Sequence, residues 1–296
     1  MYDEFKRAGE EMTIQLIIDG GGDLPPGMME THNIQYVPLN LHFGDEQYKT
    51  GETIDLPTFY EKLKQSDELP RSSSPSPNDF YEKYKQIDPN DEILVLALTQ
   101  GLSSTYESAV MGKDMLLDEE PDRKIAVLNT KTASCGIALL VHEATDRMEE
   151  GYDFDQLVSH MEERIEKTTT LFILKTLENV IKGGRLDKVK GAIAKTLNIK
   201  LLMKASDDEG AVEVTEKVRG NKKSLRRFVD QIGEYASNLE DRVIAMSHCN
   251  DEDRGKKVMS TIKERYNFKE SLFMETGPLI STYAGEGGLV IAFFKD

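Results

Sequence analysis

Runs of apolar residues alternate along most of the chain with segments in which apolar residues recur at helical spacing. The clearest run is Ile93–Leu98, six apolar residues bounded by polar ones. Such a run predicts a strand buried on both faces, as in the interior of a parallel sheet. The polar turn Thr99–Tyr106 follows and leads into Glu107–Leu117, which has helix-forming composition. We therefore expect a strand, a hydroxyl-rich turn and a covering helix at the centre of the fold.

The first half of the chain repeats this order of strand and helix. Arg71–Pro77 is predicted to be a Ser/Pro loop, and Asn78 to cap the helix after it. Short loops between such units imply a largely parallel sheet covered on both faces. The strands expected are Ile14–Ile18, Tyr36–Phe43, Ile93–Leu98 and Ile125–Leu128, and the helices are Leu56–Lys64, Asp79–Gln86, Glu107–Leu117, a segment ending at Met148, and Phe154–Lys167.

The second half has a different pattern. Ile199–Lys204 and Val212–Val218 flank a turn-rich tetrapeptide that begins at Asp207, which predicts a hairpin. One amphipathic helix is expected over Leu225–Leu239. The other expected elements are the strands Leu171–Leu174, Arg242–Met246, Ser271–Met274 and Leu289–Phe294, a short helix Glu178–Ile181, and a helix around Val258 and Ile262.

These patterns predict an α/β protein of two domains. Residues 12–167 would form an N-terminal, mainly parallel α/β sandwich, and residues 168–296 a C-terminal mixed α+β domain. Residues 1–11 are polar and charged without apolar periodicity, so we expect a disordered extension there.

Charge and cysteine content exclude several classes of function. The chain of 296 residues has 37 basic and 53 acidic residues, a net charge of −16, which argues against a nucleic-acid binder and against attraction to anionic membranes. No apolar run is long enough to span a bilayer, so no stable membrane insertion is expected. Cys135 and Cys249 lack metal-binding spacing and fit free thiols in a reducing compartment. We expect a cytoplasmic protein without a bound metal.

The turn after Ile93–Leu98 contains the first candidate site. Gly101, Ser103 and Ser104 precede a helix N-terminus, where hydroxyls and free backbone N–H groups can bind a carboxylate or phosphate. Ordinary capping of the helix by a serine is the alternative for this segment alone.

Two further patterns have enzymatic interpretations. Gly101–Thr105 approaches the G-x-S-x-G nucleophile elbow, although Thr105 replaces the last glycine, and His248 is the best-placed general base. A serine hydrolase using Ser103 with His248 is therefore the alternative function. Gly20–Gly22 fits no phosphate-loop motif, and a tight turn with positive φ is the favoured interpretation.

Several motifs, taken together and in order, resemble those of one family. They are Arg71-Ser72-Ser73-Ser74-Pro75-Ser76-Pro77, Gly101-Leu102-Ser103-Ser104-Thr105-Tyr106, Thr130-Lys131-Thr132-Ala133-Ser134-Cys135-Gly136, Lys182-Gly183-Gly184-Arg185-Leu186 with Asn198-Ile199-Lys200 after it, Lys217-Val218-Arg219-Gly220, and Gly277-Pro278-Leu279-Ile280 with Gly285-Glu286-Gly287. From about Met12 to the C-terminus the chain resembles the DegV family of bacterial fatty-acid-binding proteins.

This resemblance implies a carrier without catalytic residues or cofactor. A long-chain fatty acid such as palmitate would lie in an apolar tunnel between two α/β domains, and its carboxyl group would be presented to a separate fatty acid kinase. The fatty-acid-binding hydroxyls would be Ser72 and Ser103, with Ser73 and Ser104 adjacent to them. Arg185 and Arg219 correspond to basic residues associated with kinase binding, and the motif glycines are Gly101, Gly183 and Gly184.

The sequence departs from the family pattern at three places. Gly20–Gly22 replaces three hydroxyl-type residues between Asp19 and Asp23, and Ser72 replaces a threonine. Tyr283 stands where the family has a histidine near the C-terminal glycine-rich turn. A phenol can donate a hydrogen bond to a carboxylate but cannot supply an imidazolium, so we include Tyr283 in the fatty-acid-binding site and expect altered ionisation there.

Overall fold

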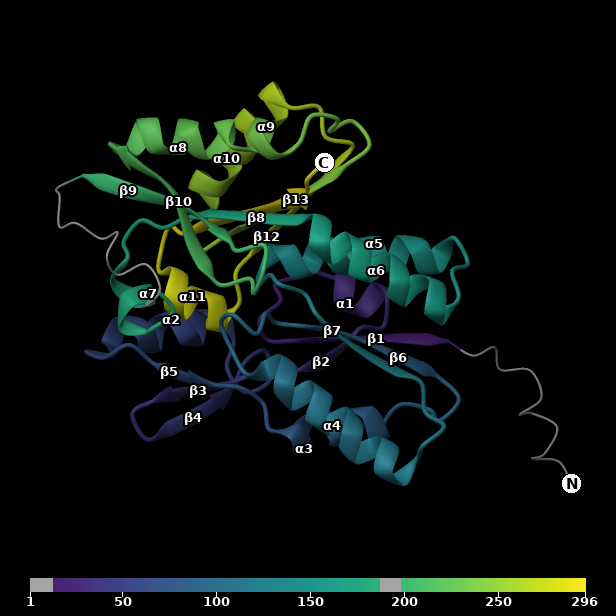
Figure 1. Ribbon diagram of the computed structural model, residues 1–296. Helices are drawn as coiled ribbons and strands as arrows, with labels where there is room; N and C mark the ends of the chain where they lie inside the picture. The colour runs from purple at the N-terminus through teal and green to yellow at the C-terminus, as the bar shows by residue number, and fades with distance from the viewer. Residues whose placement is uncertain (1–12, 187–197) are drawn as a thin grey trace, which may run out of the picture.

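The computed structural model describes residues 13–186 and 198–296, and shows two main sheets with helices between and around them (Figure 1). The disordered extension predicted for residues 1–11 lies outside the described residues, as does most of the apolar stretch that follows Leu186. Of the two main sheets, one is four-stranded and the other six-stranded.

The four-stranded sheet is entirely parallel, with the strand order β2-β1-β6-β7. All six residues of its central strand β6 are buried, which confirms the prediction of a strand covered on both faces. One face packs against α3 and α4, and the other against α5. The elements are β1 (Ile14–Asp19), β2 (Gln35–Val37), β6 (Glu92–Ala97), β7 (Ile125–Asn129), α1 (Met28–Thr31), α3 (Pro77–Lys85), α4 (Thr105–Glu119) and α5 (Cys135–Glu149).

A small antiparallel sheet, with the order β4-β3-β5, extends the first half beyond these strands. The single strand predicted over Tyr36–Phe43 is wrong, because Pro38 interrupts it and the two parts join different sheets. The predicted loop Arg71–Pro77 begins with a strand instead. The elements are β3 (Asn40–Phe43), β4 (Glu46–Lys49), β5 (Arg71–Ser73) and α2 (Leu56–Gln65).

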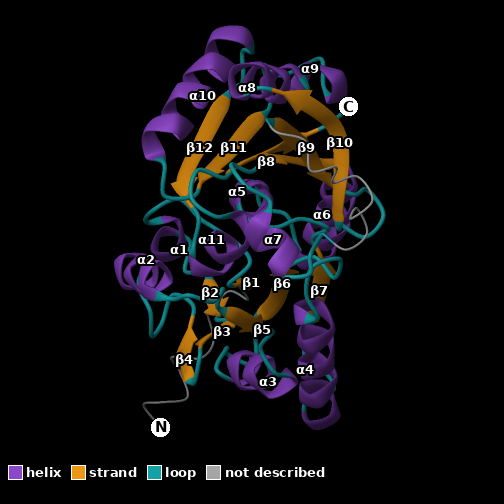
Figure 2. Ribbon diagram, turned by 90° about the vertical axis from the view of Figure 1, so that its left-hand side faces the viewer, coloured by secondary structure: helices purple, strands orange, loops and turns teal. Residues whose placement is uncertain are grey.

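The six-stranded sheet is mixed, with the order β10-β9-β8-β13-β11-β12, and only β11 and β12 pair in parallel. Figure 2 shows α8, α9 and α10 together on its outer face. The predicted hairpin is confirmed as β9 and β10. The elements are β8 (Thr168–Ile173), β9 (Ile199–Ala205), β10 (Val212–Arg219), β11 (Val243–His248), β12 (Glu270–Glu275), β13 (Leu289–Phe294), α6 (Phe154–Lys167), α7 (Glu178–Lys182), α8 (Asn221–Asp230), α9 (Ile232–Tyr235), α10 (Glu252–Arg265) and α11 (Pro278–Ala284).

Two predicted helices have other bounds in the structure. Ser76, not Asn78, caps α3: it forms a capping box with Asp79, and Pro77 takes the first helical position. The helix expected over Leu225–Leu239 ends earlier, because Ala236 is extended (φ −147°, ψ 141°) and Leu239 is buried beyond it.

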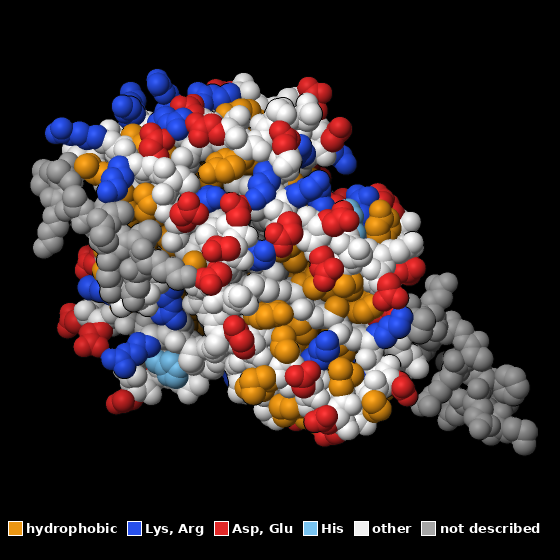
Figure 3. All heavy atoms as spheres, viewed as in Figure 1, with side chains coloured by type: hydrophobic (Ala, Val, Ile, Leu, Met, Phe, Trp, Pro, Cys, Tyr) orange, Lys and Arg blue, Asp and Glu red, His pale blue; other side chains and the backbone are white. Residues whose placement is uncertain are grey.

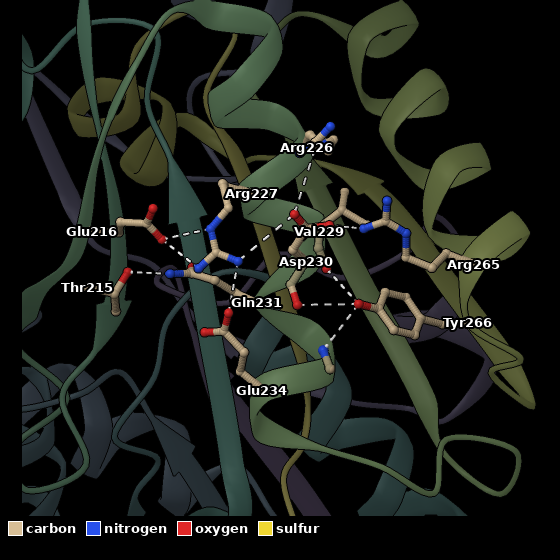
Figure 4. A network of polar contacts seen from close by, with 11 residues as sticks. Thr215, Glu216, Arg226, Arg227, Val229, Asp230, Gln231, Glu234, Arg265 and Tyr266 are labelled. Atoms are coloured by element: carbon tan, nitrogen blue, oxygen red, sulfur yellow. Dashed lines mark hydrogen bonds and ion pairs between the residues drawn. The ribbon is translucent and has the colours of Figure 1, made fainter.

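Polar contacts hold α8 and α9 against β10 (Figure 4). Arg227 contacts Glu216 of β10 at 2.6 Å and Glu234 of α9 at 2.8 Å, while Gln231 donates a hydrogen bond to Thr215 at 2.9 Å. These contacts join the helix segments to the hairpin without involving the centre of the molecule.

Helix α5 lies between the two sheets and contacts strands of both. One hydrophobic cluster runs continuously through it, from Leu16 and Leu94 of the parallel sheet to Ala245 and Val290 of the mixed sheet. The two-domain α/β fold class is thus observed, with the sheets sharing a core. The boundary proposed at Thr168 stays a prediction.

Candidate functional site

A cavity of about 890 Å³, part of it open to solvent, lies where the two halves of the molecule meet. Residues on both sides of Thr168 line it, and most are apolar: Leu39, Leu98, Leu102, Ala133, Phe172, Leu174, Val180, Ala205, Ala211, Val212, Leu279, Ile280, Ala284 and Val290. An alkyl chain could therefore pack against apolar side chains in this cavity.

Hydroxyl groups from three distant segments also line the cavity. Ser72 comes from β5, Ser103 from the turn after β6, and Tyr283 from α11. The oxygens of Ser72 and Tyr283 are hydrogen-bonded at 2.5 Å, although the residues are 211 positions apart in sequence. Ser103 is hydrogen-bonded to Thr105 at 2.8 Å, at the N-terminus of α4.

The structure separates the four predicted serines into two pairs. Successive side chains of a strand point to opposite faces, so Ser72 is turned toward the cavity while Ser73 is exposed. Ser104 is also exposed and shares a hydrogen bond of 2.7 Å with Ser74. Of these four serines, Ser72 and Ser103 line the cavity, and Ser73 and Ser104 do not.

Arg185 lies beside the same group of residues. Its guanidinium carbon lies 4.7 Å from the centre of the Tyr283 ring, a cation–π contact, and its Nη1 donates to the carbonyl oxygen of Gly183 at 2.5 Å. A Cβ on Gly183 would come within 2.4 Å of the Tyr283 ring, and Gly184 has a φ of 76°. The motif glycines therefore let Arg185 and Tyr283 approach each other.

Arg219 lies elsewhere. It is the last residue of β10, exposed, and not among the residues that line the cavity. The two arginines of the predicted kinase-binding pair therefore differ in position: Arg185 contacts the cavity and Arg219 does not.

The hairpin β9–β10 covers the turn that contains Gly101 and Ser103. The carbonyl oxygen of Glu209 accepts a hydrogen bond from the backbone N–H of Gly101 at 3.1 Å and from the Thr99 hydroxyl at 2.6 Å. A Cβ on Gly101 would lie 2.5 Å from that carbonyl oxygen. Glycine at position 101 thus lets the hairpin close over the cavity, where Ala211 forms part of the wall.

The absence of side chains at Gly20–Gly22 also lets neighbouring residues approach this segment of the backbone closely. The prediction that these glycines form a tight turn with positive φ is wrong. None of the three has a positive φ, and added Cβ atoms would lie 2.4 Å from the Thr50 hydroxyl, 2.7 Å from Leu98 and 2.8 Å from Ile137, respectively.

Two buried carboxyl groups flank this segment. Burial raises the pKa of Asp23 to about 7, against the opposing effect of hydrogen bonds from Ser134 and from the backbone N–H of Gly277. Burial likewise raises the pKa of Asp19 to about 6, against hydrogen bonds from the backbone N–H groups of Leu98 and Gly21. Asp23 thereby joins the N-terminal loop to the start of α11.

The catalytic pair of the hydrolase alternative is not formed. His248, at the end of β11, lines a separate pocket and packs against Phe273 with ring centres 5.2 Å apart. Burial lowers the pKa of His248, and its Nδ1 has no hydrogen-bond partner within the described residues. Ser103 is hydrogen-bonded to Thr105 and lines the main cavity instead.

Other possible chemistry is limited within residues 13–186 and 198–296. No group of three or more His, Cys, Asp or Glu residues there is arranged to hold a metal ion. No helix in this part of the chain has the length and hydropathy to cross a membrane. Cys135 and Cys249 are free and buried.

Two polar residues of the cavity were not predicted as site residues, namely Ser134 and Thr170. Ser134 has a φ of 57° and is hydrogen-bonded to Asp23 and, at 2.7 Å, to Ser247. The sequence motif that contains Ser134 was recognised, but its hydrogen-bond partners Asp23 and Ser247 lie on distant segments of the chain, so these contacts were not predicted. Thr170 lies within β8, where nothing in the local pattern indicates a cavity.

Comparison with known proteins identifies the family of the chain. A family profile described as uncharacterised proteins of the DegV family matches residues 13–296. The chain belongs to the DegV family. A DegV domain-containing protein of Streptococcus pneumoniae is 30% identical over 290 residues, covering 96% of this chain and 100% of that protein.

Solved DegV structures are similar over nearly their whole length. A DegV family protein of Ruminococcus gnavus, with vaccenic acid, is 31% identical with a TM-score of 0.89, covering 95% of this chain and 100% of that one. The fatty acid kinase B3 protein of Streptococcus pneumoniae, loaded with linoleic acid, is 29% identical with a TM-score of 0.85, covering 96% and 100%. Each of these two relatives therefore binds a long-chain fatty acid.

Proposed function

We propose that this DegV protein binds one long-chain fatty acid in the cavity and presents its carboxyl group to a separate fatty acid kinase. The observation that carries the proposal is an apolar cavity in which Tyr283 contacts both Ser72 and Arg185. The vaccenic and linoleic acids of the R. gnavus and S. pneumoniae relatives support the ligand class.

The chemistry of the lining suits a fatty acid at both ends. The apolar walls exclude water from an alkyl chain, which favours burial by about 0.8 kcal/mol per methylene group. Ser72, Ser103 and Tyr283 can each donate a hydrogen bond to a carboxylate, and Arg185 supplies a positive charge next to them. The position of Arg185 favours a contact with the carboxylate in addition to the kinase-binding role predicted from the motif.

A carrier needs no catalytic residues of its own, because the separate kinase would perform the reaction. The Ser103–His248 pair of the hydrolase is not formed, and the kinase would supply the phosphoryl donor, a nucleoside triphosphate. A carboxylate oxygen would form a P–O bond to the terminal phosphorus while the bond to the nucleoside diphosphate breaks, giving an acyl phosphate. The similarity to the S. pneumoniae protein named fatty acid kinase (Fak) B3, which is loaded with linoleic acid, supports a kinase partner.

Arg219 belongs to a surface suited to the kinase. The exposed side chains Lys217, Arg219, Lys222, Lys223 and Arg226 form this basic patch, and Figure 3 shows Lys and Arg side chains gathered over α8 and the neighbouring strand ends. On a chain with a net charge of −16, such a patch can direct association with an acidic partner. We assign it to kinase binding.

Binding of palmitate to the delipidated protein tests the carrier function. Ser72→Ala removes a hydrogen bond to a charged group and should weaken binding by about 1–2 kcal/mol, measured by calorimetry. Ser73→Ala is the matched control, since Ser73 is the next residue on β5 but is exposed. No palmitate uptake by wild type, or equal losses in both variants, would contradict the proposal.

Acyl phosphate formation with the cognate kinase tests the basic patch. Arg219→Ala should leave palmitate affinity within about twofold but lower the rate several-fold at low salt, because a charge that aids association is lost. Lys257→Ala, an exposed cation on α10, serves as the control. If both variants lower the rate equally, the patch has no specific role.

A further inference from the structure

A separate pocket, open to solvent, lies at one edge of the six-stranded sheet and shares no lining residue with the fatty acid cavity. It is formed where the parallel strands β11 and β12 end and α10 begins; Figure 2 shows the three elements together at this edge. The carboxyl ends of parallel strands joined by a helix are a common place for ligands. We call it the acidic pocket, because its charged lining residues are Asp251, Glu252 and Glu275.

His248 lines the same pocket and lies beside Glu275. The two residues are paired in the register of β11 and β12, and paired residues of parallel strands point to the same face of a sheet. Phe273 also lies on this face, and its ring packs against the His248 ring with centres 5.2 Å apart. A Cβ on Gly255 of α10 would lie 3.1 Å from the Cβ of His248 and 3.0 Å from the Phe273 ring. The imidazole is therefore held between α10 and the sheet, on the side of Glu275.

The His248 side chain has unused capacity for hydrogen bonds. The residue is only 5% exposed. Its Nδ1 is buried without a hydrogen-bond partner, and its Nε2 is accessible and also has none among the described residues. Burial lowers the pKa of His248, although the three carboxylates of the pocket oppose this effect, so the ring is neutral at neutral pH. Because a neutral imidazole has one nitrogen without a proton, His248 can accept a hydrogen bond from a ligand.

The three carboxylates differ in the partners that they already have. Asp251 caps α10 and accepts a hydrogen bond from the backbone N–H of Arg254 at 3.3 Å. Glu252 forms an exposed ion pair with Lys256 at 2.9 Å. Both also complement the dipole at the start of this helix. Glu275 lies on β12 instead, and it has no ion pair or hydrogen bond among the described residues. Since no Lys or Arg lines the pocket, an excess of negative charge remains beside the neutral imidazole.

We propose that the acidic pocket binds a small aliphatic diamine. One ammonium group donates hydrogen bonds to His248 and Glu275, and the other lies toward the carboxylates at the start of α10. The alkyl stem between them packs against Phe273 and Pro26, which also line the pocket. An ammonium group has donors and no acceptor, so it suits a site whose free groups are acceptors, and two such groups match carboxylates on both β12 and α10. This second ligand site is independent of the proposed function.

Putrescine (butane-1,4-diamine) is the probe, titrated by calorimetry into the full chain at about 0.15 M salt, which screens weak attraction to the acidic surface elsewhere. Glu275→Gln should weaken putrescine binding by about fivefold, because a charge-assisted hydrogen bond is lost. Asp253→Asn is the matched control and should change it by less than about twofold. Asp253 is exposed on the first turn of α10 but does not line the pocket, and its substitution alters the net charge equally. His248→Phe keeps a ring against Phe273 without its nitrogens, and should weaken binding about as much as Glu275→Gln.

Several outcomes overturn the inference. Wild type that does not bind putrescine has no such site. Equal losses in Glu275→Gln and Asp253→Asn would mean non-specific attraction to negative charge. If n-butylamine or Nα-acetyl-lysine amide binds as tightly as putrescine, the second ammonium group has no role, and a lysine side chain of a partner fits the pocket better.

A measurement on wild type keeps the test decisive if His248→Phe does not fold. The chain has five histidines, so the imidazole NMR signals of His248 can be followed individually during a putrescine titration. They should shift as the ligand binds, while those of the other histidines should not. Signals of His248 that stay unchanged at saturation would place the diamine elsewhere. Unchanged palmitate affinity in Glu275→Gln shows that this variant is folded, because the cavity and the acidic pocket share no residue.

Discussion

Tyr283 offers the sharpest test of the head-group site, because its hydroxyl can be removed while its ring is kept. The ring of Tyr283→Phe would still lie beneath Arg185 and against Gly183, so the cavity wall should be unchanged. The variant loses only the oxygen that lies 2.5 Å from Ser72. A hydrogen bond to a charged group in a partly exposed site is worth about 1–2 kcal/mol, so the Kd for palmitate should rise roughly five- to thirtyfold.

A double-mutant cycle determines whether both hydroxyls bind the same carboxylate. Calorimetry on wild type, Ser72→Ala, Tyr283→Phe and the double variant gives the four binding free energies needed. Since the two oxygens are hydrogen-bonded to each other, the two losses should be non-additive by at least about 0.5 kcal/mol. An affinity within twofold of wild type for Tyr283→Phe, beside a tenfold loss for Ser72→Ala, would refute a ligand role for the phenol.

Tyr283→His adds a pH-dependent version of the same test. A phenol carries no positive charge at any pH, whereas an imidazole becomes cationic as the pH falls through about 6.5. The ratio of variant to wild-type palmitate affinity should therefore rise between pH 7.5 and pH 5.5. A ratio that is independent of pH would place residue 283 out of reach of the carboxylate.

Two stability predictions follow from the contacts around the cavity. Gly101→Ala should lower the free energy of urea-induced unfolding by about 1–3 kcal/mol, because its Cβ would lie 2.5 Å from a backbone oxygen of the hairpin; an unchanged value would mean that the hairpin does not press on this turn. Asp23→Asn should become more stabilising relative to wild type as the pH rises from 5 toward 7.5. Because the pKa of Asp23 is raised to about 7 when folded, its stabilising contribution is present at low pH and lost through that range; a difference constant with pH would contradict this.

The sequence predicted elements best where one pattern persisted without interruption. Strand β6 was recognisable because a short apolar run between polar residues is typical of a strand buried on both faces. Helix α6 was recognisable because its apolar residues kept helical spacing over its whole length. Errors arose at interruptions of a pattern. Pro38 divides one apparent strand between two sheets, and the extended Ala236 ends an apparent helix early.

The candidate site was predictable only in part, for a similar reason. Ser72 and Ser103 were identified by short motifs, and both line the cavity. Strand alternation could have separated Ser72 from Ser73, but only once Arg71–Ser73 was known to be a strand. The contact of Arg185 with Tyr283 joins residues nearly a hundred positions apart, and no local pattern specifies it.

The walls and the polar residues of the cavity should contribute differently to function. Burying an alkyl chain of a dozen methylene groups favours binding by roughly 10 kcal/mol at about 0.8 kcal/mol each, before the entropy lost on association is subtracted. A head-group hydrogen bond contributes only about 1–2 kcal/mol. Under the proposed function, affinity should therefore come mainly from the walls, while Ser72, Ser103 and Tyr283 should fix the carboxyl end of the ligand. Because phosphoryl transfer needs the carboxylate in one orientation, loss of a head-group hydroxyl should reduce acyl phosphate formation more than it reduces fatty acid binding.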